Sequence, residues 1–247
     1  MATPQSRVPK LIDVAAPGQS SQGEVRAVVL VLPGGSVKST GRHLTMAEWG
    51  LRPLLSQLAA AATPEGIAVH MLRYRMRGWN GEAADPLADT RWALDRLREQ
   101  HGPVPVLLVG NSLGGRAAFR AADDPRVVGV VGIAPWLPAG EPVEHLAGRE
   151  VLIVHGDKDH SEASGEKSLE FAVRARAVVP ELARVEIPGA GHFLLKGAKD
   201  GFQLCTEFAM NVLAVGNRRE LLETARGGDL RTVLPIPFVA SFAGVAS

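Results

Sequence analysis

The chain has 247 residues, 46% of them hydrophobic, and its 27 lysines and arginines nearly balance its 26 aspartates and glutamates. This length suits one large α/β domain or two small ones, and the apolar content is ample for a sizeable core. The small net charge, with no long basic run, excludes the usual signature of nucleic-acid binding.

The lengths of the apolar runs and the number of cysteines indicate the compartment in which the protein is expected to lie. The strongest apolar runs, residues 27–33 and 127–137, are shorter than the roughly 20 residues that a membrane-spanning helix needs. Residues 1–10 are polar and do not resemble a signal peptide. Cys205 is the single cysteine, which excludes an internal disulfide and favours a packing role in a reducing compartment. We therefore expect a cytoplasmic protein with no membrane span.

Strand-like apolar runs alternate with helix-like amphipathic segments along most of the chain. The expected strands are residues 8–14, 25–32, 67–74, 106–109, 127–133, 151–154 and 185–187. The expected helices are residues 45–62, 86–100, 116–122, 166–179 and 201–215. This alternation predicts a mostly parallel central sheet with helices on both faces. Because no repeat or linker interrupts it, we expect a single domain over residues 1–247, with its core at about residues 25–215.

The last segment, residues 216–247, does not follow the alternation. It begins with charged residues and ends in a cluster that includes Val233, Leu234 and Phe238, which is too apolar for a solvated tail. Pro235 and Pro237 make a helix unfavourable there. We expect an extended strip packed on the body of the same chain, with a partner subunit as the alternative destination.

A sharp turn joins the strand at residues 106–109 to the helix that follows. The sequence from Gly110 to Gly114 matches the pattern G-x-S-x-G, in which a strained turn lifts a serine, here Ser112, off the end of a strand. Glycines leave room for this bend, and the N-terminus of the next helix favours a developing negative charge. The pattern is short enough to occur by chance, so residues elsewhere in the chain must support it.

Chemically useful residues follow four of the expected strands. Ligands of doubly wound sheets bind at the carboxyl ends of the strands, so these residues are expected to converge. Their order along the chain is a serine, an acid and a histidine, which is the order of the α/β-hydrolase triad. The residues are Gly34 and Gly35, then Ser112, then Asp157 and Asp159, and finally His192.

From about residue 25 to residue 215 the chain resembles the α/β-hydrolase family. The resemblance implies the α/β-hydrolase fold, with no cap domain, because residues 137–150 are too few for the insertion that many members carry. It also implies nucleophilic catalysis by Ser112. The matching segments are Leu32-Pro33-Gly34-Gly35, Arg77-Gly78, Gly110-Asn111-Ser112-Leu113-Gly114-Gly115, His155-Gly156-Asp157-Lys158-Asp159 and Gly189-Ala190-Gly191-His192-Phe193.

The resemblance assigns the base and the acid. His192 follows the last expected strand in a Gly-Ala-Gly turn and is the implied base, which a serine hydroxyl needs near neutral pH. The family pattern Gly-x-x-Asp places the acid at Asp159, where it would orient His192. Asp157 is the alternative, although an aspartate at such a position more often supports the turn itself.

The resemblance also points to an oxyanion hole and a substrate pocket. One backbone N–H donor is expected from Leu113 and the other from Gly35, with Ser36 as the alternative. Trp79 and Trp136 follow strand ends on the same rim, so together with Ser36 they are candidates for lining the pocket. Packing of the rim is the other role that these tryptophans could have.

These features predict a serine hydrolase that cleaves a carboxylic ester or thioester of a small molecule through a Ser-His-Asp triad. A non-catalytic ligand-binding or scaffold protein on the same fold is one alternative, and another acyl-transfer or C–C hydrolase chemistry is a second. We expect no metal, because the triad uses Asp157, Asp159 and His160 better than a cation would. No cofactor is expected either, because no phosphate-binding G-x-G-x-x-G follows the first strand.

Overall fold

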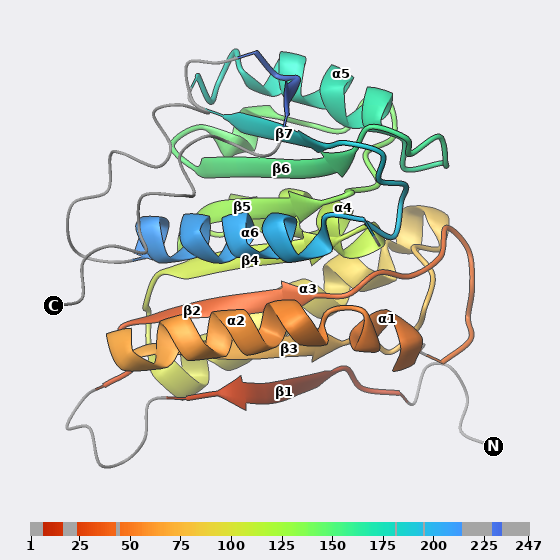
Figure 1. Ribbon diagram of the computed structural model, residues 1–247. Helices are drawn as coiled ribbons and strands as arrows, with labels where there is room; N and C mark the ends of the chain where they lie inside the picture. Colours follow the sequence, from red (N-terminus) through yellow and green to blue (C-terminus); the bar gives the residue numbers. More distant parts are fainter. Residues whose placement is uncertain are drawn as a thin grey trace, which may run out of the picture.

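The computed structural model describes residues 7–16, 24–42, 45–180, 182–194, 196–213 and 229–233. Within these residues, eight strands form one sheet in the order β1-β3-β2-β4-β5-β6-β7-β8 (Figure 1). All neighbouring strands are parallel except β1 and β3. The strands are β1 Lys10–Ala15, β2 Ala27–Leu32, β3 Ile67–Arg73, β4 Val106–Asn111, β5 Val127–Ile133, β6 Glu150–Gly156, β7 Ala183–Ile187 and β8 Thr232–Val233.

Helices cover both faces of the sheet, as the alternating pattern predicts (Figure 1). α2 and α6 pack on one face, and α3, α4 and α5 pack on the other. The central strands are apolar on both sides because each face meets a helical layer, and every residue of β2 is buried. The helices are α1 Thr45–Trp49, α2 Arg52–Ala62, α3 Asp85–His101, α4 Leu113–Arg120, α5 Gly165–Ala175 and α6 Ala198–Leu213.

The helices differ in their limits from the predicted ones, and two of the differences have an identifiable feature at the change. The helix expected at residues 45–62 is divided into α1 and α2 at Gly50, and Pro53 lies in the first turn of α2, where its missing N–H is tolerated. Trp49, which the periodicity places with the apolar residues of a continuous helix, is 60% exposed. α5 ends at Ala175, not at Val179, and the chain continues to Pro180 in tight turns in which the N–H groups of Ala177 and Val178 donate to carbonyls three residues back.

The edge strand β8 is not among the strands expected from the sequence. Thr232 and Val233 pair in parallel with β7, and Leu230 beside them is buried. The rest of residues 216–247 lies outside the described residues, and so does most of the strip that we expect to pack on the body. None of the described helices is long and apolar enough to cross a membrane.

Register brings the candidate residues to one edge of the sheet. Leu32 lies beside Gly110, and Asn111 lies beside Ile133, so β2, β4 and β5 end at the same level. Gly156 and Ile187 end β6 and β7 side by side in the same way. Between β5 and β6 the only regular element is the short 3-10 turn Glu144–Leu146, so the described chain has no cap at this position.

Candidate active site

Ser112 lies in the sharp turn between β4 and α4. Its φ of 53° and ψ of −116° are outside the regions that residues with a Cβ favour, so the backbone is strained at this serine. Hydrogen bonds to the end of β5 hold it there, with the Ser112 N–H donating to Ile133 O at 2.9 Å and Ser112 O accepting from the Trp136 N–H at 2.9 Å. A Cβ at Gly110 would collide with the Gly114 carbonyl, which explains why the turn needs glycine.

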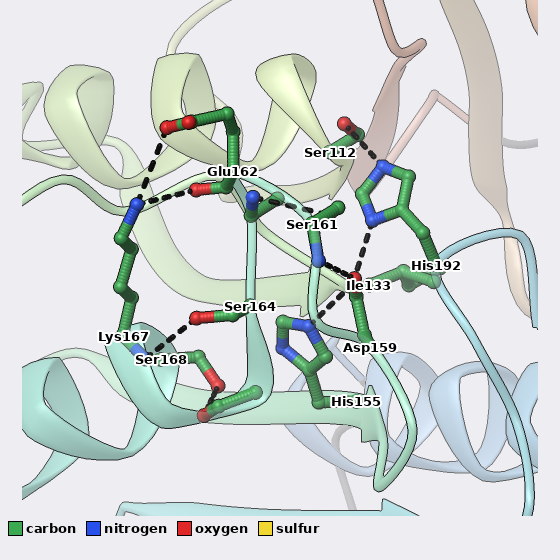
Figure 2. A network of polar contacts seen from close by, with 12 residues as sticks. Ser112, Ile133, His155, Asp159, Ser161, Glu162, Ser164, Lys167, Ser168 and His192 are labelled. Atoms are coloured by element: carbon green, nitrogen blue, oxygen red, sulfur yellow. Dashed lines mark hydrogen bonds and ion pairs between the residues drawn. The ribbon is translucent and has the colours of Figure 1, made fainter.

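Three side chains from separate loops meet at this turn (Figure 2). Ser112 Oγ lies 2.9 Å from His192 Nε2, and His192 Nδ1 lies 2.7 Å from Asp159 Oδ2. Asp159 comes from the loop after β6, and His192 comes from the loop after β7. This continuous chain of hydrogen bonds is the arrangement in which a carboxylate orients an imidazole and the imidazole accepts a proton from a serine hydroxyl.

The Asp159 carboxylate is buried but has several donors around it. Its Oδ1 accepts the Ser161 backbone N–H at 3.0 Å, and its Oδ2 accepts from His155 at 3.0 Å as well as from His192. Burial raises the pKa of Asp159, but these hydrogen bonds outweigh burial and hold the pKa well below its ordinary value. The carboxylate is therefore ionised near neutral pH.

His155 is a site residue to which the sequence assigned no role. Its side chain is fully buried, and burial lowers its pKa despite the opposing influence of Asp159. We assign it as a neutral ring that donates its Nε2–H to Asp159, because among the described residues its Nδ1 has no hydrogen-bond partner. Its position directly before the Gly-x-x-Asp segment is the sequence signal that marks it.

Asp157, the alternative acid, has a different partner. Its Oδ1 accepts the backbone N–H of Gly189 at 2.6 Å and so ties the loop after β6 to the turn that precedes His192. The structure thus brings Asp159 to His192 and brings Asp157 to the backbone of the histidine loop. This is the supporting role that side-chain to backbone hydrogen bonds give to an aspartate in a turn.

Two backbone N–H groups beside Ser112 are available for a developing oxyanion. Within the described part of the chain, neither the Gly35 nor the Leu113 N–H has a hydrogen-bond acceptor. The Ser36 N–H donates to Arg77 O at 2.9 Å, so Ser36 cannot supply the second donor in this conformation. A Cβ at Gly35 would collide with that same Arg77 carbonyl, which explains the need for glycine in this loop.

Two cavities adjoin Ser112 and His192, and they have different linings. The first, which we name the α1–α6 cavity, has a volume of about 480 Å³. The second, which we name the Trp136 cavity, has a volume of about 320 Å³. The α1–α6 cavity is lined by Gly34, Gly35, Met46, Ala47, Gly50, Leu51, Asn111, Ser112, Ile133, His192, Phe193, Leu194 and Phe202. The Trp136 cavity is lined by Gly35, Ser36, Val37, Ser112, Leu113, Trp136, Ser161, Glu162, Ala163 and His192.

The two candidate tryptophans occupy different positions. Trp136 lines the second cavity, whereas Trp79 is 4% exposed and lines neither cavity. Their rings meet edge to face at 6.1 Å, and the Arg116 guanidinium lies over both, 4.0 Å from the Trp79 ring centre and 4.5 Å from that of Trp136. Arg116 is in turn paired with the buried Glu141. This arrangement makes Trp79 a packing residue that supports the rim.

Comparisons with known proteins agree with this architecture. Residues 28–150 match the model of the Alpha/beta hydrolase family. The structure is similar to that of Est1E from Butyrivibrio proteoclasticus with bound ferulic acid, at 16% identity and a TM-score of 0.59 over 84% of this chain and 95% of that one. It is also similar to a monoacylglycerol lipase from Paleococcus ferrophilus, at 16% identity and a TM-score of 0.56 over 82% of this chain and 97% of that one.

A third solved structure has the same fold. It is the esterase domain of a Rhodothermus marinus protein, at 17% identity and a TM-score of 0.53 over 83% of this chain and 100% of that one. No curated protein matches the chain in sequence. The protein has the α/β-hydrolase fold, and the family resemblance predicted from the sequence is confirmed. The fold, the matched family model and the esterase and lipase structures beside it support a hydrolase.

Among the described residues, no group of three histidine, cysteine, aspartate or glutamate side chains could hold a metal ion. Cys205 is buried on α6, and burial raises the pKa of its thiol well above the ordinary value. A thiol in that state packs as a small apolar group and is a poor nucleophile.

Proposed function

We propose that the protein is a serine hydrolase that cleaves a carboxylic ester or thioester of a small molecule. The observation that carries the proposal is the hydrogen-bonded chain from Ser112 Oγ through the His192 imidazole to Asp159 Oδ2. The esterase and lipase names of structures with this fold favour ester chemistry over the other reactions that the fold hosts. The N–H groups of Gly35 and Leu113, which have no acceptor among the described residues, support it further, because acyl transfer requires such donors.

In the proposed reaction, Ser112 Oγ attacks the acyl carbonyl carbon while His192 Nε2 takes the hydroxyl proton. The carbonyl oxygen becomes an oxyanion and accepts hydrogen bonds from the backbone N–H groups of Gly35 and Leu113. When the carbonyl re-forms, the bond to the leaving oxygen or sulfur breaks, and that atom takes the proton from His192. Water then attacks the acyl group on Ser112 with His192 as base, which releases a carboxylic acid and restores the serine.

The role of Asp159 in this scheme follows from its surroundings. Its pKa is held well below the ordinary value, so it stays ionised while His192 gains and loses the proton. An ionised carboxylate on Nδ1 keeps the neutral imidazole in the tautomer whose Nε2 can accept the serine proton. The same charge stabilises the imidazolium that forms during each half of the reaction.

The test combines active-site labelling with turnover. We expect a fluorophosphonate probe to label the protein at Ser112 and expect hydrolysis of p-nitrophenyl acetate and of an acetyl thioester. Turnover also separates a hydrolase from a ligand-binding or scaffold protein on the same fold. If the probe labels nothing and neither compound is hydrolysed, the proposed function is wrong.

A further inference from the structure

The α1–α6 cavity differs chemically from the rest of the site. Apart from the backbone and side-chain groups of Asn111, Ser112 and His192 at its inner end, its lining is glycine or apolar. Leu51, Ile133 and Leu194 form buried walls, each no more than 3% exposed, and no lysine, arginine, aspartate or glutamate of the described residues lines it. A carbon chain is the ligand that such a lining accepts without losing hydrogen bonds to water.

At the mouth of this cavity two large apolar side chains face solvent. Met46 on α1 is 81% exposed, and Phe193 beside His192 is 82% exposed. Both also line the cavity, so the apolar surface continues from the wall to the outside of the molecule. Contiguous exposed apolar surface of this kind is typical of a binding site.

The Trp136 cavity differs in its size and its access to solvent. It is smaller and more open to solvent, and its lining combines apolar side chains such as Val37 and Trp136 with the polar groups of Ser161 and Glu162. After the leaving group departs, water must enter the space that it vacated in order to reach the acyl carbon on Ser112. The more open Trp136 cavity gives water a path to that carbon, whereas the deeper and more enclosed α1–α6 cavity can hold a chain that is still attached to the serine.

We propose that the α1–α6 cavity binds the acyl chain of the substrate and that the Trp136 cavity holds the leaving group. The substrate class is then esters or thioesters of unbranched fatty acids of medium length. At roughly 30 Å³ for each small group, a volume of about 480 Å³ has room for on the order of sixteen groups, so a chain of about eight carbons fits together with the atoms at the carbonyl. This inference rests on the proposed function and specifies the substrate of the same site.

The first experiment varies the acyl chain with the leaving group held constant. We expect kcat/KM for p-nitrophenyl esters to rise at least tenfold from the acetate to the octanoate, because each buried methylene contributes about 0.8 kcal/mol, or about fourfold. Varying the alcohol of acetate esters instead should produce no comparable rise. Acetate turnover with no dependence on acyl length would overturn this inference and leave the proposed function standing.

A variant that fills the α1–α6 cavity then tests whether the acyl chain binds there. Gly50 lines the cavity and has no positive φ, and a Cβ added there would lie no closer than 3.9 Å to another group, at Met46 O, so a side chain fits without strain. Gly50→Leu should lower the octanoate-to-acetate ratio of kcat/KM by tenfold or more. Ala60→Leu, the same kind of substitution at an exposed position of α2, is the control and should keep the wild-type ratio. An unchanged ratio in Gly50→Leu would contradict the assignment, and Ala47→Leu provides a second filling variant if Gly50→Leu does not fold.

A binding measurement decides the question even without turnover. We expect octanoate to raise the Tm of the wild-type protein and of Ala60→Leu, and to have a smaller effect on Gly50→Leu, because a ligand stabilises the state that binds it. Equal shifts in all three proteins would place the fatty chain elsewhere. Absence of any ester or thioester hydrolysis together with a Gly50-dependent shift would reject the proposed reaction but retain the chain-binding cavity.

Discussion

His155 Nε2 lies 3.0 Å from Asp159 Oδ2, the same oxygen that accepts the His192 Nδ1–H at 2.7 Å. One carboxylate oxygen thus serves two imidazoles, one fully buried at the end of β6 and one partly exposed beside Ser112 (Figure 2). The hydrogen bond from His155 anchors this carboxylate to the buried end of β6. His155 is therefore a positioning residue that acts through Asp159.

The first prediction concerns this buried histidine. His155→Leu should lower kcat about tenfold or more, because a carboxylate that loses one anchor no longer holds the imidazole at the correct angle. His155→Gln, which keeps an N–H donor, should recover part of the loss. Equal losses of kcat in the two variants, in step with their losses of Tm, would show that the ring serves only to fill space.

The second prediction concerns the nucleophile. Ser112→Ala should abolish fluorophosphonate labelling and lower kcat by at least about 10³, because residues that act as a unit lose their joint effect when one is removed. The backbone strain at residue 112 is retained by alanine, so the melting temperature serves as the folding control. Labelling that persists at another serine would refute the assignment.

The third prediction separates the two aspartates. Asp159→Asn should lower kcat by roughly 10² to 10⁴, because an amide permits the wrong histidine tautomer. Asp157→Asn keeps an oxygen that can accept the Gly189 N–H, so its kcat should fall less than tenfold. Steady-state kinetics of both variants on one ester is sufficient. A larger loss in Asp157→Asn would show that the acid has been assigned to the wrong residue of the loop.

The fourth prediction concerns a buried arginine on β7, next to the edge strand β8. The Arg184 guanidinium on β7 is 1% exposed and donates to Glu186, to Leu230 O at 2.7 Å and to Gly165 O at 3.0 Å. Arg184→Met should lower the free energy of unfolding by about 3 kcal/mol, since it removes the buried partner of Glu186, which keeps only the Arg231 contact at 3.7 Å, and takes one donor from each of the two carbonyls. Arg231→Met, at a side chain that is 49% exposed, should change it by less than about 1 kcal/mol. Urea titration measures both, and similar values for the two variants would contradict the prediction.

The fifth prediction concerns stability against pH. His70 on β3 and His101 at the end of α3 lie 2.9 Å apart, Nε2 to Nε2, and burial lowers the pKa of both despite the nearby Asp13. The unfolded chain therefore binds more protons than the folded one below an ordinary histidine pKa of about 6.5. Stability should fall as the pH drops through the window between that value and the lowered folded values, by at most about 1.4 kcal/mol per pH unit for each group.

Unfolding free energies measured between pH 8 and pH 5 would test this sign. His101→Gln should flatten the dependence, because one of the two titrating rings is removed. Burial also lowers the pKa of His155, so part of the dependence should persist in that variant. A stability that is constant or that increases toward pH 5 in the wild-type protein would contradict the argument.

Much of the fold follows from local sequence alone. A short continuous apolar run such as Ala27–Leu32 is typical of a strand buried on both faces, so the alternation of such runs with amphipathic segments predicts the parallel sheet. The steric demand at Gly110 is equally local, because a Cβ there would meet the Gly114 carbonyl of the same turn, and this helps to predict the position of Ser112 at a strand end. At Gly114 the demand is tertiary, because a Cβ there would meet Leu32 O and Pro33 O after β2. Periodicity carries no such signal for β8, which has only two residues and exists because β7 offers an unpaired edge.

In the candidate site, too, some features can be predicted from the sequence and others are decided only by the tertiary structure. The chain order of serine, acid and histidine is a property of the sequence, and so is their common place after parallel strands. Only the tertiary structure decides that Asp159 reaches His192 while Asp157 bonds to Gly189, because two residues in one short loop differ by a few ångströms in where they point. Only the tertiary structure shows that the Ser36 N–H donates to Arg77 O and so is not available as an oxyanion donor. It alone also places His155 within hydrogen-bond distance of Asp159. These outcomes depend on contacts between loops that are distant along the chain, and no local pattern of residues encodes such distances.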